Sequence, residues 1–184
     1  MIFRRPLVTL FPLSIAALLA APAGALAQAQ HAHVHGQLKL DIAIDGPTVV
    51  IAMDSPLDNL VGFERAPKTD AERQTVEDAV TALKAADKLF AIDPAANCKL
   101  GPVELESAAL GLGKQGAAIA ADAHADLDAT FSFNCTNAAA AKYIDVSLFT
   151  AFKGTRQIDA QIVTPQGQFQ RTLKRPNVRL AWGR

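Results

Sequence analysis

The sequence predicts an α+β fold in which an antiparallel β-sheet packs against one main α-helix, all within a single domain. Two observations support this prediction. Several segments carry apolar residues at every second position and are joined by short turns, which is typical of antiparallel strands with one buried face. One longer segment carries apolar residues at intervals of three and four, which is typical of a helix that covers a sheet.

The first predicted element is a β-hairpin made of residues 37–44 and 48–53. Between these segments lies Asp45-Gly46-Pro47, a turn signal. The second segment is rich in β-branched residues, which favour strands. The apolar residues of the first segment alternate with polar or small ones and define one buried face: Leu38, Leu40, Ile42 and Ile44.

The main helix is predicted over residues 69–90, after a short helical turn in residues 57–63. Thr69 and Glu72 have the spacing of a capping box, which satisfies free backbone N–H groups at a helix start. Asp93-Pro94 is a stop signal. The apolar stripe of this helix consists of Val76, Ala79, Val80, Leu83, Ala86 and Phe90.

The rest of the chain is predicted to be mostly β. A weaker strand is expected within residues 99–110, starting around Val103, and a clear one over residues 125–135. In the clear strand one face carries Leu127, Ala129, Phe131 and Phe133. Shorter strands are expected over residues 143–149, 156–163, 168–173 and 178–182.

The N-terminal residues 1–27 have the pattern of a secretory signal peptide. Arg4 and Arg5 precede an apolar run, and Ala25-Leu26-Ala27 fits a cleavage site. Cleavage after Ala29 fits the same pattern. We therefore expect an exported protein that works in the periplasm.

After cleavage we expect a flexible histidine-containing arm over residues 28–36 and one α+β domain over residues 37–184. The whole chain has 18 basic and 18 acidic residues, and the leader carries two of the bases and none of the acids. The mature chain is then slightly acidic, which argues against nucleic acid as a partner. No other apolar run approaches the roughly 20 residues that cross a bilayer, so we expect no membrane insertion of the mature chain.

Cys98 and Cys135 are the only cysteines. An even count without C-x-x-C spacing, in an exported chain, favours one structural disulfide. Closing that loop would stabilise the fold by roughly 3 to 4 kcal/mol. The alternative is two buried free thiols.

Three of the four histidines lie within five residues, in His31-Ala32-His33-Val34-His35. On a strand these positions share one face, so the three imidazoles could converge on one metal ion. The fourth histidine, His124, is followed two residues later by Asp126, which by the same argument shares its face. The metal-binding candidates are therefore His31, His33, His35, His124 and Asp126, although incidental histidines in a polar arm would give the same pattern.

No catalytic motif accompanies these residues, so we expect a protein that is not an enzyme. The sequence has no G-x-S-x-G elbow, no H-E-x-x-H pair and no glycine-rich phosphate loop. Glu104 and Glu106 lie on one face of the weaker strand, where exposed acids are the simpler interpretation than a paired-carboxylate glycosidase.

The chain resembles the ZrgA-type periplasmic zinc-uptake proteins over nearly all of its mature length. The most specific part of the resemblance is Ser55-Pro56-Leu57-Asp58-Asn59-Leu60-Val61-Gly62-Phe63-Glu64, after the histidine cluster that enters the first strand. Further matches are His124-Ala125-Asp126, Phe133-Asn134-Cys135, Gln168 and Arg175-Pro176. Two departures are the lack of histidine in residues 111–123, where many members have a histidine-rich tract, and Arg65, where histidine is common.

The resemblance implies a periplasmic protein that binds Zn²⁺ and assists high-affinity zinc uptake, alongside the periplasmic component of a zinc ABC importer. A copper- or nickel-binding periplasmic protein remains an alternative, because imidazole ligates these metals as well. A metal-independent envelope adaptor or binding module is the third hypothesis, and it would use a sheet face or edge to meet another protein.

Overall fold

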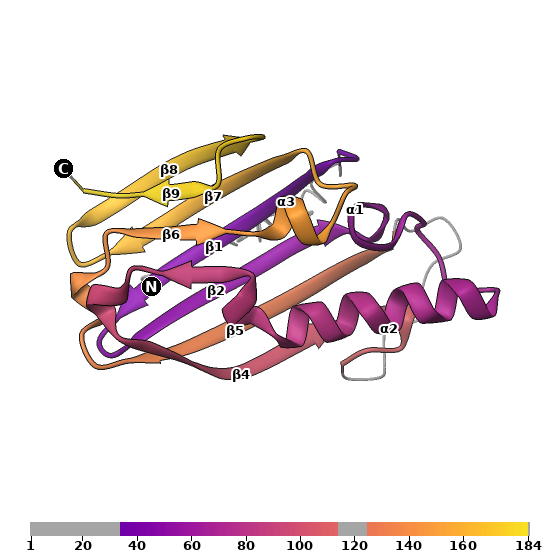
Figure 1. Ribbon diagram of the computed structural model, residues 1–184, viewed down its shortest axis with the longest axis horizontal. Helices are drawn as coiled ribbons and strands as arrows, with labels where there is room; N and C mark the ends of the chain where they lie inside the picture. The colour runs from indigo at the N-terminus through magenta and orange to yellow at the C-terminus, as the bar shows by residue number, and fades with distance from the viewer. Residues whose placement is uncertain (1–33, 114–124, 184) are drawn as a thin grey trace, which may run out of the picture. The chain divides into compact units, whose positions relative to one another are not determined.

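The computed structural model describes residues 34–113 and 125–183, and it corrects the predicted fold class. These residues form a mostly β structure of nine strands in two sheets, not one antiparallel sheet packed against one main helix. Figure 1 shows the smaller sheet lying across one face of the larger one. The described residues belong to one of two compact units of the chain, Ala32–Arg184.

The larger sheet has six strands in the order β4-β5-β2-β1-β7-β8. Its strands are β1 (Gln37–Asp45), β2 (Thr48–Pro56), β4 (Cys98–Glu106), β5 (Asp126–Cys135), β7 (Gln157–Thr164) and β8 (Gly167–Lys174). The smaller sheet has the order β3-β6-β9, with β3 (Phe90–Ile92), β6 (Tyr143–Val146) and β9 (Arg179–Ala181). The α-helices are α1 (Leu57–Val61), α2 (Asp70–Lys84) and α3 (Leu148–Ala151).

The predicted hairpin is confirmed as β1 and β2, which pair antiparallel from Lys39 with Asp54 to Asp45 with Thr48. The predicted alternation is observed in β1, where Leu38, Leu40 and the later apolar residues are buried while their neighbours are half-buried or exposed. One pair in the larger sheet is parallel, however, because β1 and β7 run in the same direction. The predicted all-antiparallel sheet is therefore wrong at this position.

The predicted main helix is shorter than expected and does not cover the sheet. The capping box is confirmed, since the side chain of Thr69 accepts a hydrogen bond from Glu72 N and that of Glu72 accepts one from Thr69 N. Only Ala79 and Leu83 of α2 are buried, and the helix ends at Lys84. In Figure 1 α2 lies at the lower right, beside α1 and away from the smaller sheet.

The last two residues of the predicted apolar stripe are not in the helix, since each belongs to a later element. Ala86 lies in a short 3-10 turn, and Phe90 begins β3. The Phe90 ring contacts the ring of Phe131 on β5, with 5.1 Å between the centroids. The core is therefore formed mainly between two sheets, and each fully buried large apolar side chain stabilises it by about 1.5 to 3 kcal/mol.

One end of the larger sheet lies next to α1, and we call it the α1 end. β1, β5 and β7 begin there, and β2, β4 and β8 end there. β2 leads directly into α1. In the described residues, no helix combines the length and apolar character that a bilayer span requires.

Candidate metal centre

His35 lies at the α1 end, in a turn immediately before β1. Gln37 N donates a hydrogen bond to Val34 O at 2.9 Å and closes this turn. The His35 Nε2 atom lies 2.9 Å from Glu64 Oε1, and its Nδ1 atom lies 3.9 Å from Asp58 Oδ2. The imidazole is therefore flanked by two carboxylates, and with 55% of its side chain exposed it remains accessible to an ion from solution.

The two carboxylates come from the segment that follows the hairpin. Pro56 is the last residue of β2, and α1 begins at the next residue and carries Asp58 in its first turn. The helix ends at Val61 and is capped by Gly62, which has a φ of 85°, and the chain then leads to Glu64. The side chain of Glu64 is 18% exposed, compared with 36% for Asp58, so the closer acid is also the more buried one.

Asn59, the residue after Asp58, is buried and contacts the backbone beside His35. Its Oδ1 atom accepts a hydrogen bond from Gly36 N at 2.5 Å, and its Nδ2 atom donates one to Gln37 O at 2.8 Å. The short helix α1 therefore both presents an acid to His35 and holds the chain on which His35 lies.

Arg65 follows Glu64 but is directed to α2. Its guanidinium donates two hydrogen bonds to Glu72, at 2.9 and 2.7 Å. These bonds, with further ones from the backbone N–H groups of Lys68 and Thr69, lower the pKa of Glu72 to about 2. The pair fixes the segment that carries Glu64 to the start of α2.

Three of the predicted ligands, His31, His33 and His124, lie outside the described residues. The described chain resumes after His124 at Ala125, whose carbonyl oxygen accepts a hydrogen bond from Leu57 N at 2.8 Å. Ala125 is thus anchored to α1 one residue before Asp58.

Asp126, the remaining predicted ligand, opens β5 and is not brought into contact with His35. Asp126 pairs with Pro56 of β2, and β2 in turn pairs with β1. Since neighbouring strands lie about 4.8 Å apart, Asp126 lies about 10 Å from the start of β1. Its side chain points to the sheet face opposite to that of Leu127, as the alternation predicts.

Over residues 34–113 and 125–183, no group of three or more histidine, cysteine or acidic side chains is arranged to hold a metal ion. His35 and Glu64 nevertheless offer a nitrogen and an oxygen donor, which are common zinc ligands. Two ligands of one tetrahedral zinc lie roughly 3.3 to 3.6 Å apart, given bonds of about 2.0 to 2.2 Å. The observed 2.9 Å therefore needs only a small outward movement to admit an ion.

Sequence reasoning did not assign Asp58 and Glu64 to the site, although one signal for Asp58 was available. The hairpin pairs Lys39 with Asp54. Continuing that register by four residues on each strand brings position 35 opposite position 58. Glu64 has no such signal, because its position depends on how the chain turns after α1.

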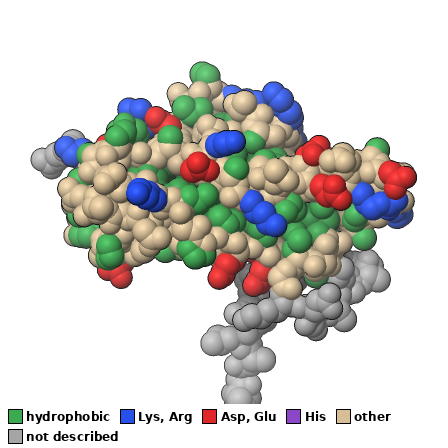
Figure 2. All heavy atoms as spheres, turned by 60° about the horizontal axis from the view of Figure 1, so that its bottom comes forward, with side chains coloured by type: hydrophobic (Ala, Val, Ile, Leu, Met, Phe, Trp, Pro, Cys, Tyr) green, Lys and Arg blue, Asp and Glu red, His purple; other side chains and the backbone are tan. Residues whose placement is uncertain are grey.

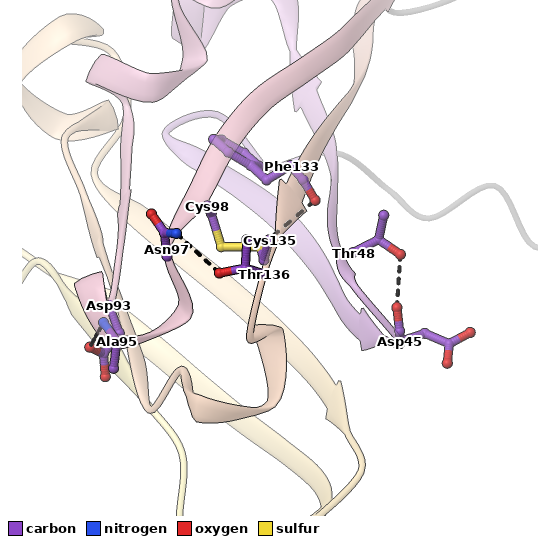
Figure 3. The surroundings of a disulfide bond; sticks show 9 residues. All are labelled: Asp45, Thr48, Asp93, Ala95, Asn97, Cys98, Phe133, Cys135 and Thr136. Carbon is purple, nitrogen blue, oxygen red and sulfur yellow. Dashed lines mark hydrogen bonds between the residues drawn. A yellow bond between two sulfur atoms is a disulfide. The ribbon is translucent and has the colours of Figure 1, made fainter.

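The disulfide predicted between Cys98 and Cys135 is confirmed, and it lies at the other end of the larger sheet. The two cysteines are directly opposite each other where β4 begins and β5 ends. Figure 3 shows the adjacent hydrogen bond between Asn97 Nδ2 and Thr136 Oγ1, which is 3.0 Å long. The disulfide and its neighbours contain no histidine and do not contribute to the candidate centre.

The surface charge of the described residues is mixed on the face shown in Figure 2. Lysine and arginine side chains are scattered among aspartate and glutamate, with apolar side chains between them. This face therefore lacks the continuous basic surface that phosphate backbones require.

Fold and site together define a class: a disulfide-linked, two-sheet β protein with a histidine and two carboxylates at one end of the larger sheet. Its pattern matches the ZrgA family zinc uptake proteins over residues 32–182. The chain belongs to this family, which confirms the resemblance noted in its sequence and gives it a role in zinc uptake. No curated protein matches the chain significantly.

Proposed function

We propose that this chain is a periplasmic zinc-binding protein that captures Zn²⁺ and assists its high-affinity uptake, without catalysing a reaction. The observation that carries the proposal is the contact of 2.9 Å between His35 Nε2 and Glu64 Oε1 in a member of a zinc uptake family. Capture requires an exposed donor that exchanges ions with solution, and the half-exposed imidazole of His35 meets this requirement.

In this proposal His35 and Glu64 supply two of the four ligands that zinc usually takes. Asp58 is the nearest further acid, with Oδ2 at 3.9 Å from Nδ1 of His35. Two of His31, His33 and His124 are proposed to fill the two remaining positions, and Asp126 is the proposed partner of His124. Hand-over to the periplasmic component of an ABC importer would follow capture.

The test is calorimetric titration of the purified protein with zinc. We expect binding near one ion per chain, with the affinity reduced at least tenfold in H35A and E64Q and lost in the triple variant H31A/H33A/H35A. The matched control is Glu104→Gln, which neutralises an exposed acid on β4 and should bind zinc like the wild type. Unchanged binding in all three site variants would refute the proposal and favour a metal-independent adaptor.

The same titration at two pH values tests the ligand type. Imidazole must be deprotonated to ligate, so protons compete with zinc for the site. We expect zinc affinity to fall clearly between pH 7.5 and pH 5.5. A constant affinity over that range would contradict ligation by histidine.

A further inference from the structure

Asn59 holds the peptide bond from which His35 projects. Its side chain is 1% exposed, and its Oδ1 atom accepts a hydrogen bond from Gly36 N. That N–H belongs to the planar peptide unit that joins His35 to Gly36, so the bond fixes the orientation of the unit as a whole. The second bond, from Nδ2 to Gln37 O, holds the next residue in place as well.

The same peptide segment is held from the opposite side by the chain entering β7. Gly36 O accepts hydrogen bonds from Arg156 N at 2.7 Å and from Gln157 N at 2.9 Å. Gly36 has a φ of +86°, and a Cβ at this position would lie 2.5 Å from Nε of Arg156. The segment before β1 is therefore enclosed between α1 and β7.

The turn that leads into β7 approaches α1 equally closely. A Cβ on Gly154 would lie 2.6 Å from Asn59 O, so only glycine allows this contact. The backbone of Asn59 packs against Gly154, and its side-chain amide bonds the backbone of Gly36 and Gln37. The side chain therefore has a fixed position. A buried side chain whose rotamer is locked by packing is well suited to preorganise a binding site.

An amide is the side chain that these two bonds require. Gly36 N needs an acceptor and Gln37 O needs a donor, and the asparagine side chain supplies both. An aspartate in its place would accept from Gly36 but could not donate to Gln37. Both hydrogen bonds are made by the Asn59 amide, and neither is made by Asp58, the residue before it on the helix.

We propose that Asn59 is a positioning residue for the zinc site: it fixes the His35 peptide so that the imidazole meets Glu64 and Asp58, and it does not touch the ion. This inference rests on the proposed function, because it concerns the same histidine. Losing an outer partner that orients a ligating histidine typically reduces metal affinity 10- to 100-fold, and we expect a loss in this range.

The test compares zinc titrations of the wild type, N59D, N59S and H35A, with T164A as a matched control. N59D adds a charge and N59S does not, so a loss common to both cannot come from charge. Thr164 is also buried, and its hydroxyl bonds Gln166 N and Gly167 O at the far end of β7. T164A therefore removes buried hydrogen bonds without touching the His35 segment.

A second readout separates positioning from general stability. The imidazole resonances of His35 are recorded by NMR in the zinc-free proteins, at a temperature where urea titration shows each to be folded. We expect these resonances to shift in N59D and N59S but to stay unchanged in T164A, and zinc affinity to fall only in the Asn59 variants.

The outcomes distinguish the two proposals. If the wild type binds zinc, H35A weakens binding and both Asn59 variants bind like the wild type, the positioning role is overturned and the proposed function stands. If T164A loses as much affinity as N59S, the effect is one of stability and the positioning role is again overturned. If the wild type does not bind zinc, or H35A binds as tightly as the wild type, both proposals fail.

Discussion

His35 is placed by contacts that come from residues well separated from it in sequence. Its own position within the histidine cluster is visible in the sequence, and so is its proximity to the first strand. The acids that flank it are not, because Asp58 and Glu64 reach it only after β2 has returned along β1 and α1 has turned the chain. Patterns within a segment therefore indicate a ligand type, while the identity of its neighbours depends on tertiary structure.

Glu72 is the residue for which the structure predicts a pH-dependent contribution to stability. Hydrogen bonds from the Arg65 guanidinium and from backbone N–H groups lower its pKa from 4.5 to about 2. Because the folded pKa lies below the unfolded one, the stabilisation is complete above about pH 4.5 and is lost as the pH falls toward 2. We expect wild type to exceed E72Q in its urea midpoint at pH 6, and the difference to disappear near pH 2.

The control for this prediction is Glu77→Gln, on the exposed part of the same helix. This variant should follow the wild type at every pH. A difference between wild type and E72Q that persists unchanged at pH 2 would contradict the assignment, because protonated Glu72 cannot accept the charge-assisted bonds from Arg65.

At the scale of single elements, the longer strands with one buried face follow their sequence patterns closely. The hairpin of β1 and β2 and the strand β5 are predicted with nearly their observed bounds, because each buries one face and so alternates with a period of two. The third strand, β3, was missed because it has only three residues and continues the helical stripe. A stripe of apolar residues indicates which side chains are buried, but it does not indicate the residue at which a helix ends.

A further prediction concerns which part of α2 packs against the hydrophobic core. Leu83 is fully buried, whereas Val76 is only partly buried, so the C-terminal part of the helix supplies the apolar contacts. We expect Leu83→Ala to cost about 2 to 5 kcal/mol in the free energy of unfolding. Val76→Ala should cost clearly less.

Urea denaturation followed by the fluorescence of Trp182 measures both variants, since this is the only tryptophan in the chain and it is buried. Equal losses for the two variants would show that the N-terminal part of α2 is packed as tightly as its C-terminal part. That result would contradict the burial on which the prediction depends.

At the scale of the whole molecule, the decisive features are pairings between distant segments. β7 lies parallel to β1 although more than a hundred residues separate them, and β6 joins β3 to β9 in a second sheet. Alternation reveals that a strand has a buried face, but it does not name what covers that face. The sequence therefore predicted most of the strands but not their division into two sheets, and it assigned to α2 the role of covering the larger sheet.

The disulfide and the candidate metal centre lie at opposite ends of the larger sheet, and this separation gives the last prediction. β5 begins at the α1 end and reaches Cys135 after 10 residues, a span of roughly 30 Å. We expect the double variant C98S/C135S to lose about 2 to 5 kcal/mol of stability, because its unfolded chain is no longer cross-linked. Zinc affinity should change less than twofold where the variant is folded.

Urea titration and zinc calorimetry on the same samples measure the two quantities, and wild type treated with a reductant provides the matched comparison. A stability loss without an affinity loss is expected because the contacts of His35 with Glu64, Asp58 and the Asn59-bound backbone do not pass through β4. A tenfold fall in zinc affinity in the folded variant would instead show that the cross-link between β4 and β5 governs the geometry at the α1 end. In that case the geometry of the site would depend on more than α1, the start of β1 and the start of β7.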